Sequence, residues 1–161
     1  NVKISEPEYL SGWKITANPN GLIINQNGQI YDNLYWEGTG NGLYPTITQG
    51  RVVSSKNIAA ELQNDLTVLG LNKKESADFM AFWLSKMPNT PYIRLTWLDT
   101  DKMNKLAPLA VSPRPNTVAR VFLDFQGQNN SSTNLTPQKL TSFERKGFTL
   151  VEWGGLLVGG R

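Results

Sequence analysis

The range 54–98 places the strongest constraint on the fold, because it holds the clearest helical periodicity in the chain. Three aliphatic residues recur there at four-residue spacing: Ile58, Leu62 and Leu66. This spacing puts one apolar stripe on a helix. Gly70 is a natural end for it, since glycine adopts the left-handed conformation without a Cβ penalty. We therefore expect a helix over residues 56–69.

A second helix is predicted directly after the first. Asn72 can act as its N-cap, and Glu75 follows three residues later, which is a variant of the capping box. Pro88 ends the helical pattern, so we expect this helix over residues 73–86. The alternating residues 92–98 then predict a strand.

The remaining sequence is mostly strand-like. Residues 1–11 can form an edge strand or tail, and turns near residues 18–21 and 26–28 predict an antiparallel meander over the first forty residues. Residues 117–125 are apolar on both faces, as in a central strand, and residues 147–153 form a final strand. The predicted fold is α+β: a mainly antiparallel sheet of five or more strands with the two-helix pair packed on one face.

The predicted core combines residues from these helices and strands. Its members are Trp13, Ile15, Leu62, Leu66, Phe79, Trp83, Ile93, Leu95, Val121, Leu123 and Val151. We also expect most of the five tryptophans to be buried.

Composition limits the chemistry available. The chain has 161 residues, which predicts one domain over 1–161 with a C-terminal tail at 156–161. It contains neither Cys nor His, so a thiolate zinc site, a cysteine nucleophile and a Ser-His-Asp triad are excluded. The net charge is +3, with −2 in residues 1–80 and +5 in residues 81–161. The basic residues are scattered, so no nucleic-acid partner is indicated, and no apolar stretch is long enough to cross a membrane.

Two polar segments have simple interpretations. Residues 99–101 read Asp-Thr-Asp and resemble the start of a calcium loop, but the later ligands of such a loop are missing. A turn or a helix N-cap is therefore favoured. We expect no metal and no cofactor. Residues 126–138 lack periodicity and predict a mobile loop rather than a site.

Charged side chains on the strong strands form the candidate site. Arg120 and Asp124 share one strand face, and Glu152 can lie near Arg120 if the last strand pairs beside it. Together with Arg94 they predict an exposed binding patch on the sheet face opposite the helices. The alternative is a carboxylate-based hydrolase, for example one acting on glycans, in which Asp124 and Glu152 share acid–base work. An ordinary structural ion pair is the simplest interpretation of Arg120 and Glu152.

Aromatic residues stand beside carboxylates in Trp36-Glu37 and Glu152-Trp153, as they do in many sugar sites. Adjacent strand residues point to opposite faces, however, so neither pair can line one pocket without a bulge.

Five segments carry a family likeness: Gly12–Ile15, Leu34–Glu37, Pro91–Ile93, Arg120–Phe122 and Gly147–Gly155. Together they resemble a poorly characterised, mostly bacterial family of secreted or surface-associated proteins. In that family a Gly-Trp-x-Val strand leads into Tyr-Leu-Phe-Trp-Glu, and Gly-Phe-Thr-Val-Val-Glu-Trp-Gly-Gly closes the domain after a helical pair. The likeness spans about Tyr9 to Gly155.

The resemblance implies an extracellular or cell-surface setting. Family members have a further β segment upstream, with a Lys-Pro-Val-Ile-Tyr-Leu-Tyr-Pro stretch, and this chain lacks that segment. The resemblance therefore also implies that one edge of the sheet can pair with such a segment. The family has no established activity, and the resemblance assigns no catalytic residue. We therefore expect a non-catalytic module with a glycan or protein partner.

Overall fold

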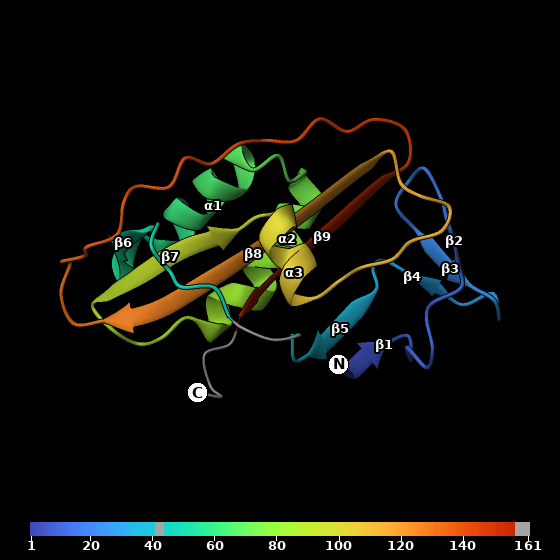
Figure 1. The fold of residues 1–161 in the computed structure, drawn as a ribbon, viewed down its shortest axis with the longest axis horizontal. Helices are drawn as coiled ribbons and strands as arrows, with labels where there is room; N and C mark the ends of the chain where they lie inside the picture. Colours follow the sequence, from blue (N-terminus) through green and yellow to red (C-terminus); the bar gives the residue numbers. More distant parts are fainter. Residues whose placement is uncertain (41–43, 157–161) are drawn as a thin grey trace. The chain divides into compact units, whose positions relative to one another are not determined.

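The computed structural model describes residues 1–40 and 44–156 (Figure 1). The length predicts one domain, and the structure divides the chain into two compact units, Asn1–Tyr44 and Pro45–Arg161. The described residues form nine strands and three α-helices, with the strands in sheets of two, three and four. Most strand pairs are antiparallel, so the predicted α+β class is confirmed. The two units are described separately below.

Unit 1 consists of two small antiparallel sheets. Strands β2 (Ile15–Ala17), β3 (Ile23–Asn25) and β4 (Ile30–Tyr31) form the predicted meander. Strands β1 (Val2–Glu6) and β5 (Tyr35–Gly38) pair with each other instead of extending it. The prediction of one continuous meander was therefore wrong at its last strand, because β5 pairs with the distant chain start and not with its sequence neighbour.

Unit 2 is built on a four-stranded sheet with the order β6-β7-β8-β9. The strands are β6 (Arg51–Ser54), β7 (Tyr92–Leu98), β8 (Thr117–Gln128) and β9 (Thr149–Leu156). Strand β8 is central, as predicted, with β7 antiparallel on one side and β9 parallel on the other. The segment between β8 and β9 makes this parallel pairing possible by returning along the unit before β9 begins (Figure 1).

The two predicted helices follow β6. The first comprises a 3₁₀ turn, η1 (Ser55–Asn57), and α1 (Ile58–Val68). It ends at Gly70, whose φ is +88°, and the Leu71 N–H bonds back to the Leu66 carbonyl at 3.1 Å. The second comprises α2 (Lys73–Trp83) and η2 (Leu84–Lys86).

The predicted capping box is present at the start of α2. The Asn72 side chain accepts from the Glu75 N–H at 2.9 Å, and the Glu75 carboxylate accepts from the Asn72 N–H at 2.8 Å. Both helices pack on one face of the four-stranded sheet (Figure 1).

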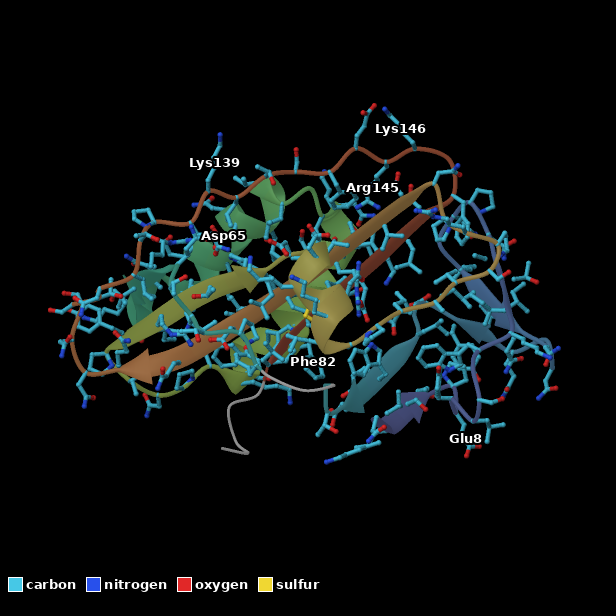
Figure 2. All side chains as sticks on the ribbon, viewed as in Figure 1. Glu8, Asp65, Phe82, Lys139, Arg145 and Lys146 are labelled. Carbon is cyan, nitrogen blue, oxygen red and sulfur yellow. The ribbon has the colours of Figure 1, made fainter. Side chains whose placement is uncertain are left out.

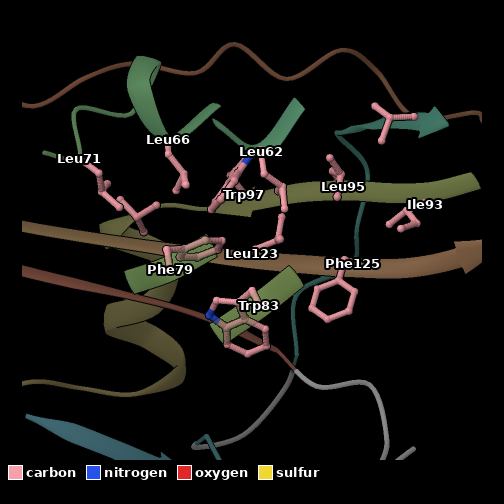
Figure 3. Packing of buried hydrophobic residues seen from close by; sticks show 12 residues of the cluster. Leu62, Leu66, Leu71, Phe79, Trp83, Ile93, Leu95, Trp97, Leu123 and Phe125 are labelled. Carbon is pink, nitrogen blue, oxygen red and sulfur yellow. The ribbon is translucent and has the colours of Figure 1, made fainter. Parts of the chain in front are cut away.

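The core of unit 2 lies between these helices and the sheet (Figure 3). Phe79 is at its centre: its ring lies 5.6 Å from that of Trp97 and 5.8 Å from that of Trp153. Eight of the predicted core residues are buried: Leu62, Leu66, Phe79, Trp83, Ile93, Leu95, Val121 and Leu123.

Three core predictions were wrong. Trp13 and Val151 are only half-buried, and Ile15 is 37% exposed. Ile15 belongs to a three-residue strand in a unit whose described residues form no helix, and Val151 belongs to an edge strand. Of the five tryptophans only Trp83 and Trp97 are buried, so the expectation that most are buried was wrong too.

Gly154 and Gly155 lie inside β9 instead of ending it. A Cβ on Gly154 would be 2.8 Å from the Phe122 ring, and a Cβ on Gly155 would be 2.9 Å from the Trp83 ring. Aromatic rings therefore lie directly on this backbone from both sides of the sheet, which leaves no space for a side chain.

The opposite face of the sheet carries α3 (Thr100–Leu106), which begins at Asp99. The Asp99 carboxylate accepts from the Lys102 N–H at 3.0 Å and from the Lys102 ammonium group at 2.8 Å. The N-cap interpretation of residues 99–101 is thereby confirmed. Burial alone would raise the pKa of Asp99, but the hydrogen bonds and charge of Lys102 lower it below its ordinary value.

A long segment without helix or strand, residues 129–148, runs along the outer side of the helix pair (Figures 1 and 2). Arg145 bonds to the Glu75 carboxylate and, at 3.2 Å, to the Gly70 carbonyl, so the segment is anchored where the helices meet. Residues 139–144 form neither a helix nor a strand.

Candidate functional site

The four predicted site residues share one sheet face, opposite the helix pair. In the register of the strands Arg120 lies beside Glu152, and Thr96 lies beside Asp124. Arg120 forms an ion pair with Glu152, and Arg94 forms one with Asp124. The predicted pair of Arg120 and Glu152 is therefore present, whereas the pair of Arg94 and Asp124 was not predicted.

The prediction of an exposed patch was wrong. Arg94 is 6% exposed, Arg120 2% and Asp124 0%, while Glu152 is half-buried. Helix α3 covers the face around Arg120, and the loop after β8 borders it around Arg94. Helix α3 follows β7 in the chain and the loop follows β8, but each lies against an arginine of the neighbouring strand, a contact that strand periodicity does not reveal.

Arg120 serves to hold α3 on the sheet. Its guanidinium donates to the Asn104 side chain at 3.0 Å and to the Ala107 carbonyl at 2.7 Å, where α3 ends. Its backbone N–H donates to the Thr100 hydroxyl at 3.0 Å, where α3 begins. With Glu152 also bound, this arginine is a structural residue of the interior.

Arg94 has a different environment. It donates to Asp124 and, at 2.9 Å, to the Thr96 hydroxyl, which in turn donates to the Gln49 carbonyl at 2.7 Å. A guanidinium has five N–H donors. Arg94 therefore retains donors beyond the two nitrogens that bind Asp124 and Thr96.

Arg94 also lies at a hollow of about 330 Å³, which we call the Arg94 hollow. It is lined by Arg94, Gln128, Ser132, Thr133, Asn134 and Leu135. Four of these lining residues have neutral polar side chains, one is apolar, and Arg94 alone is charged.

The predicted loop at residues 126–138 begins later than expected, and part of it lines this hollow. Residues 126–128 continue β8, and residues 132–135 line the hollow. The signal in the sequence is a run of amides and hydroxyls directly after a strand. Arg94, Thr96 and Asp124 are among the polar residues on the adjoining face of β7 and β8.

The loop is tethered to the sheet beyond the hollow. The Gly50 N–H donates to the Thr136 carbonyl at 2.9 Å, and the Thr136 N–H donates to the Thr48 carbonyl at 3.1 Å. The Gln138 amide then bonds both backbone groups of Trp97, accepting from its N–H at 2.8 Å and donating to its carbonyl at 2.6 Å. The loop that lines the hollow therefore continues from β8 at its start and is hydrogen-bonded to the sheet and to residues 48–50 at its end.

The two carboxylates of the hydrolase alternative are far apart along the sheet. Glu152 lies beside Arg120 and Asp124 beside Leu156, so their positions differ by four residues along the ladder. At a rise of about 3.3 Å per residue this is roughly 13 Å. Catalytic carboxylate pairs of glycosidases are separated by about 5 to 9.5 Å. The backbone therefore does not set Asp124 and Glu152 at a catalytic spacing.

A second buried acid, Asp65 of α1, is labelled in Figure 2. It accepts from the Arg51 guanidinium at 2.9 and 3.0 Å and from the Trp97 indole N–H at 2.6 Å. Burial would lower the pKa of Arg51, but hydrogen bonds and charges from Asp65 and Glu61 raise it above its usual value. These contacts join α1 to β6 and β7, which is a structural role.

Comparison with protein-family models, with curated proteins and with solved structures gave no match. Among residues 1–40 and 44–156, no group of three or more acidic, cysteine or histidine side chains is placed to hold a metal ion. Within the same ranges no helix is both long and apolar enough to cross a membrane.

Proposed function

We propose that this chain is a binding module that recognises a glycan or a protein through the Arg94 hollow and catalyses no reaction. The family likeness of its strand motifs supports placing this role outside the cell or at the cell surface. The ligand is proposed to contact the polar side chains that line the hollow and Arg94.

One observation carries this proposal. The Arg94 hollow combines a cation buried to more than nine-tenths with four neutral polar side chains from one tethered loop and the adjoining strand. The hollow is open, and Ser132, Thr133 and Asn134 of its lining are exposed, so their polar groups are accessible to a ligand. Its volume is at the lower end of the usual range for ligand sites, about 300 Å³. Recognition requires such groups, whereas catalysis also requires a positioned acid, base or nucleophile.

The ion pairs favour binding over hydrolysis. A carboxylate that acts on a substrate must reach the reacting atoms, but Asp124 is fully buried against Arg94. Glu152 is engaged by Arg120, which also holds α3. Both acids are thus parts of the internal structure of the sheet face.

The proposal is tested by binding and activity measurements on the same preparations. A glycan array and a pull-down from a cell envelope are made with the wild-type chain, with a double variant Gln128→Ala and Asn134→Ala, and with Lys139→Ala. The two substituted residues line the hollow, whereas Lys139 is exposed farther along the same segment (Figure 2). We expect the double variant to lose at least about tenfold in affinity, which is about 1.4 kcal/mol, and the control to bind like wild type.

The proposal would be overturned if the chain turned over a generic glycosidase, esterase, phosphatase or peptidase substrate and the activity depended on its carboxylates. The activity must disappear in Glu152→Gln or Asp124→Asn while the variant still melts cooperatively. Such a result would establish the hydrolase alternative.

A further inference from the structure

We infer that the Arg94 hollow binds a single uncharged sugar unit, such as a neutral hexose or an N-acetylhexosamine at the end of a glycan. This inference rests on the proposed binding function and specifies its ligand. It follows from the charge balance of the hollow, from its unused hydrogen-bonding groups and from its size.

The charge balance disfavours an anionic ligand. Arg94 is the charged residue of the lining, and its positive charge is already paired with Asp124, which is 0% exposed. A carboxylate or phosphate entering the hollow would approach this buried carboxylate and compete with it for the same guanidinium. Like charges brought together in a partly desolvated site repel each other. A hydroxyl group can accept from the remaining N–H donors without displacing Asp124.

The neutral lining groups suit hydroxyls. The side chains of Gln128, Ser132 and Asn134 make no hydrogen bond to any other residue in the described part of the chain. A carboxamide offers two donors and an acceptor, and a serine hydroxyl donates and accepts. Sugar hydroxyls also donate and accept, so a sugar can satisfy both halves of each amide, which a carboxylate, an acceptor only, cannot.

The backbone of the loop is bonded at several points beside these side chains. The Asn130 side chain accepts from the Ser132 N–H at 3.1 Å, and the Thr133 hydroxyl accepts from the Leu135 N–H at 3.2 Å. Thr136 is then bonded to Thr48 and Gly50. A loop that is ordered before binding pays less conformational entropy when the ligand arrives.

Size and the one apolar residue limit the ligand further. The volume of about 330 Å³ is at the lower end of the range for ligand pockets, so it accommodates one sugar ring and not a long segment. Leu135 offers an apolar surface in an otherwise polar lining, and a pyranose has an apolar C–H face that can contact it. We therefore expect recognition of a terminal unit and little dependence on glycan length.

The test is ligand-observed NMR with the full chain and matched disaccharides. The neutral probes are cellobiose, lactose, mannobiose and chitobiose, and the acidic probes are digalacturonic acid and a sulfated lactose. Each is measured with wild type, with the double variant Gln128→Ala and Asn134→Ala, and with Lys139→Ala. Circular dichroism and thermal melting verify that every variant is folded.

We expect at least one neutral probe to bind, with affinity at least tenfold weaker in the double variant and unchanged in Lys139→Ala. Binding of acidic probes alone, lost in the double variant, would overturn the inference and leave the proposed binding function standing. A protein partner captured through the hollow, with no saccharide bound, would have the same effect. Sugar binding that the double variant does not weaken would overturn the assignment to the hollow. Cleavage of a probe would overturn the proposed function itself.

Discussion

Unit 1 and unit 2 contain the same kind of alternating strand, but only unit 2 forms a buried core. No described residue of unit 1 is buried, and its strands are two to five residues long. In unit 2 the seven-residue β7 and the twelve-residue β8 are buried over most of their length. Both regions have strand periodicity, so periodicity alone does not determine burial.

The difference lies in the second layer. Unit 2 has a helix pair on one sheet face and α3 on the other, whereas the described residues of unit 1 contain no helix. A sheet excludes water from its apolar face only when another layer covers it. The comparison teaches that the helices predicted first from the sequence also determine which strands form the core.

The largest expected effect on stability compares one alanine substitution in each unit. Phe79→Ala removes the ring at the centre of the core of unit 2 and should destabilise the chain by about 3 to 5 kcal/mol. Ile15→Ala in β2 of unit 1 should cost less than about 1 kcal/mol, because Ile15 is 37% exposed and lies outside the buried core. Urea unfolding followed by tryptophan fluorescence measures both. Equal losses would mean that unit 1 has a core of comparable weight.

A smaller effect tests the polar interior of unit 2. Asp65→Ala leaves the Trp97 indole N–H and the Arg51 guanidinium without their buried acceptor, and should cost roughly 2 to 3 kcal/mol. Glu61→Ala is the matched control, since Glu61 pairs with the same arginine at the surface and should cost about 0 to 1 kcal/mol. Similar losses for the two variants would show that the buried contacts of Asp65 add nothing.

The tether of the loop after β8 is expected to matter less. Gln138→Ala leaves the backbone N–H and carbonyl of Trp97 without their partner and should cost about 1 to 2 kcal/mol. Lys139→Ala, one residue later and exposed, should change stability by less than about 0.5 kcal/mol. Thermal melting compares them. A Gln138→Ala variant as stable as wild type would show that the loop is not held by this amide.

The smallest effect is a titration within unit 1. Burial, followed by the hydrogen bond and negative charge of Glu37, raises the pKa of Tyr35 from 10.0 to about 12. The folded pKa is higher than the unfolded one, so this contribution to stability is complete below pH 10 and is lost as the pH rises through about 12. Absorbance at phenolate wavelengths should show one late-titrating tyrosine that disappears in Tyr35→Phe. A Tyr35→Phe variant that retains the late tyrosine would contradict the assignment.

The parts of the fold that the sequence predicted depend on local interactions. The capping box at Asn72 and Glu75 and the glycine stop at Gly70 involve residues within one or two helical turns, so they can be found without tertiary information. The ion pair of Arg120 with Glu152 was also anticipated, because it required only strand parity and one assumed pairing.

The parts that were missed depend on contacts between distant segments. The pairing of β1 with β5 and the cover over Arg120 by α3 leave no periodic signal in either segment. The Arg94 hollow is harder still, because the loop at residues 132–135 has polar side chains without periodicity and becomes a lining only through its position beside Arg94. The alternation of apolar and polar residues along a strand therefore could not show whether Arg94, Arg120 and Asp124 are exposed or buried.

The central claim is that the helix-covered sheet, which carries the Arg94 hollow, supplies the stability of the chain. Hydrogen–deuterium exchange of the full chain, read by peptide mass spectrometry, tests it most directly. We predict that amides of β7 and β8 exchange slowest, through global unfolding, and that amides of β2, β3 and β4 exchange at least about a hundredfold faster. Equal protection of these two groups of strands would contradict the account.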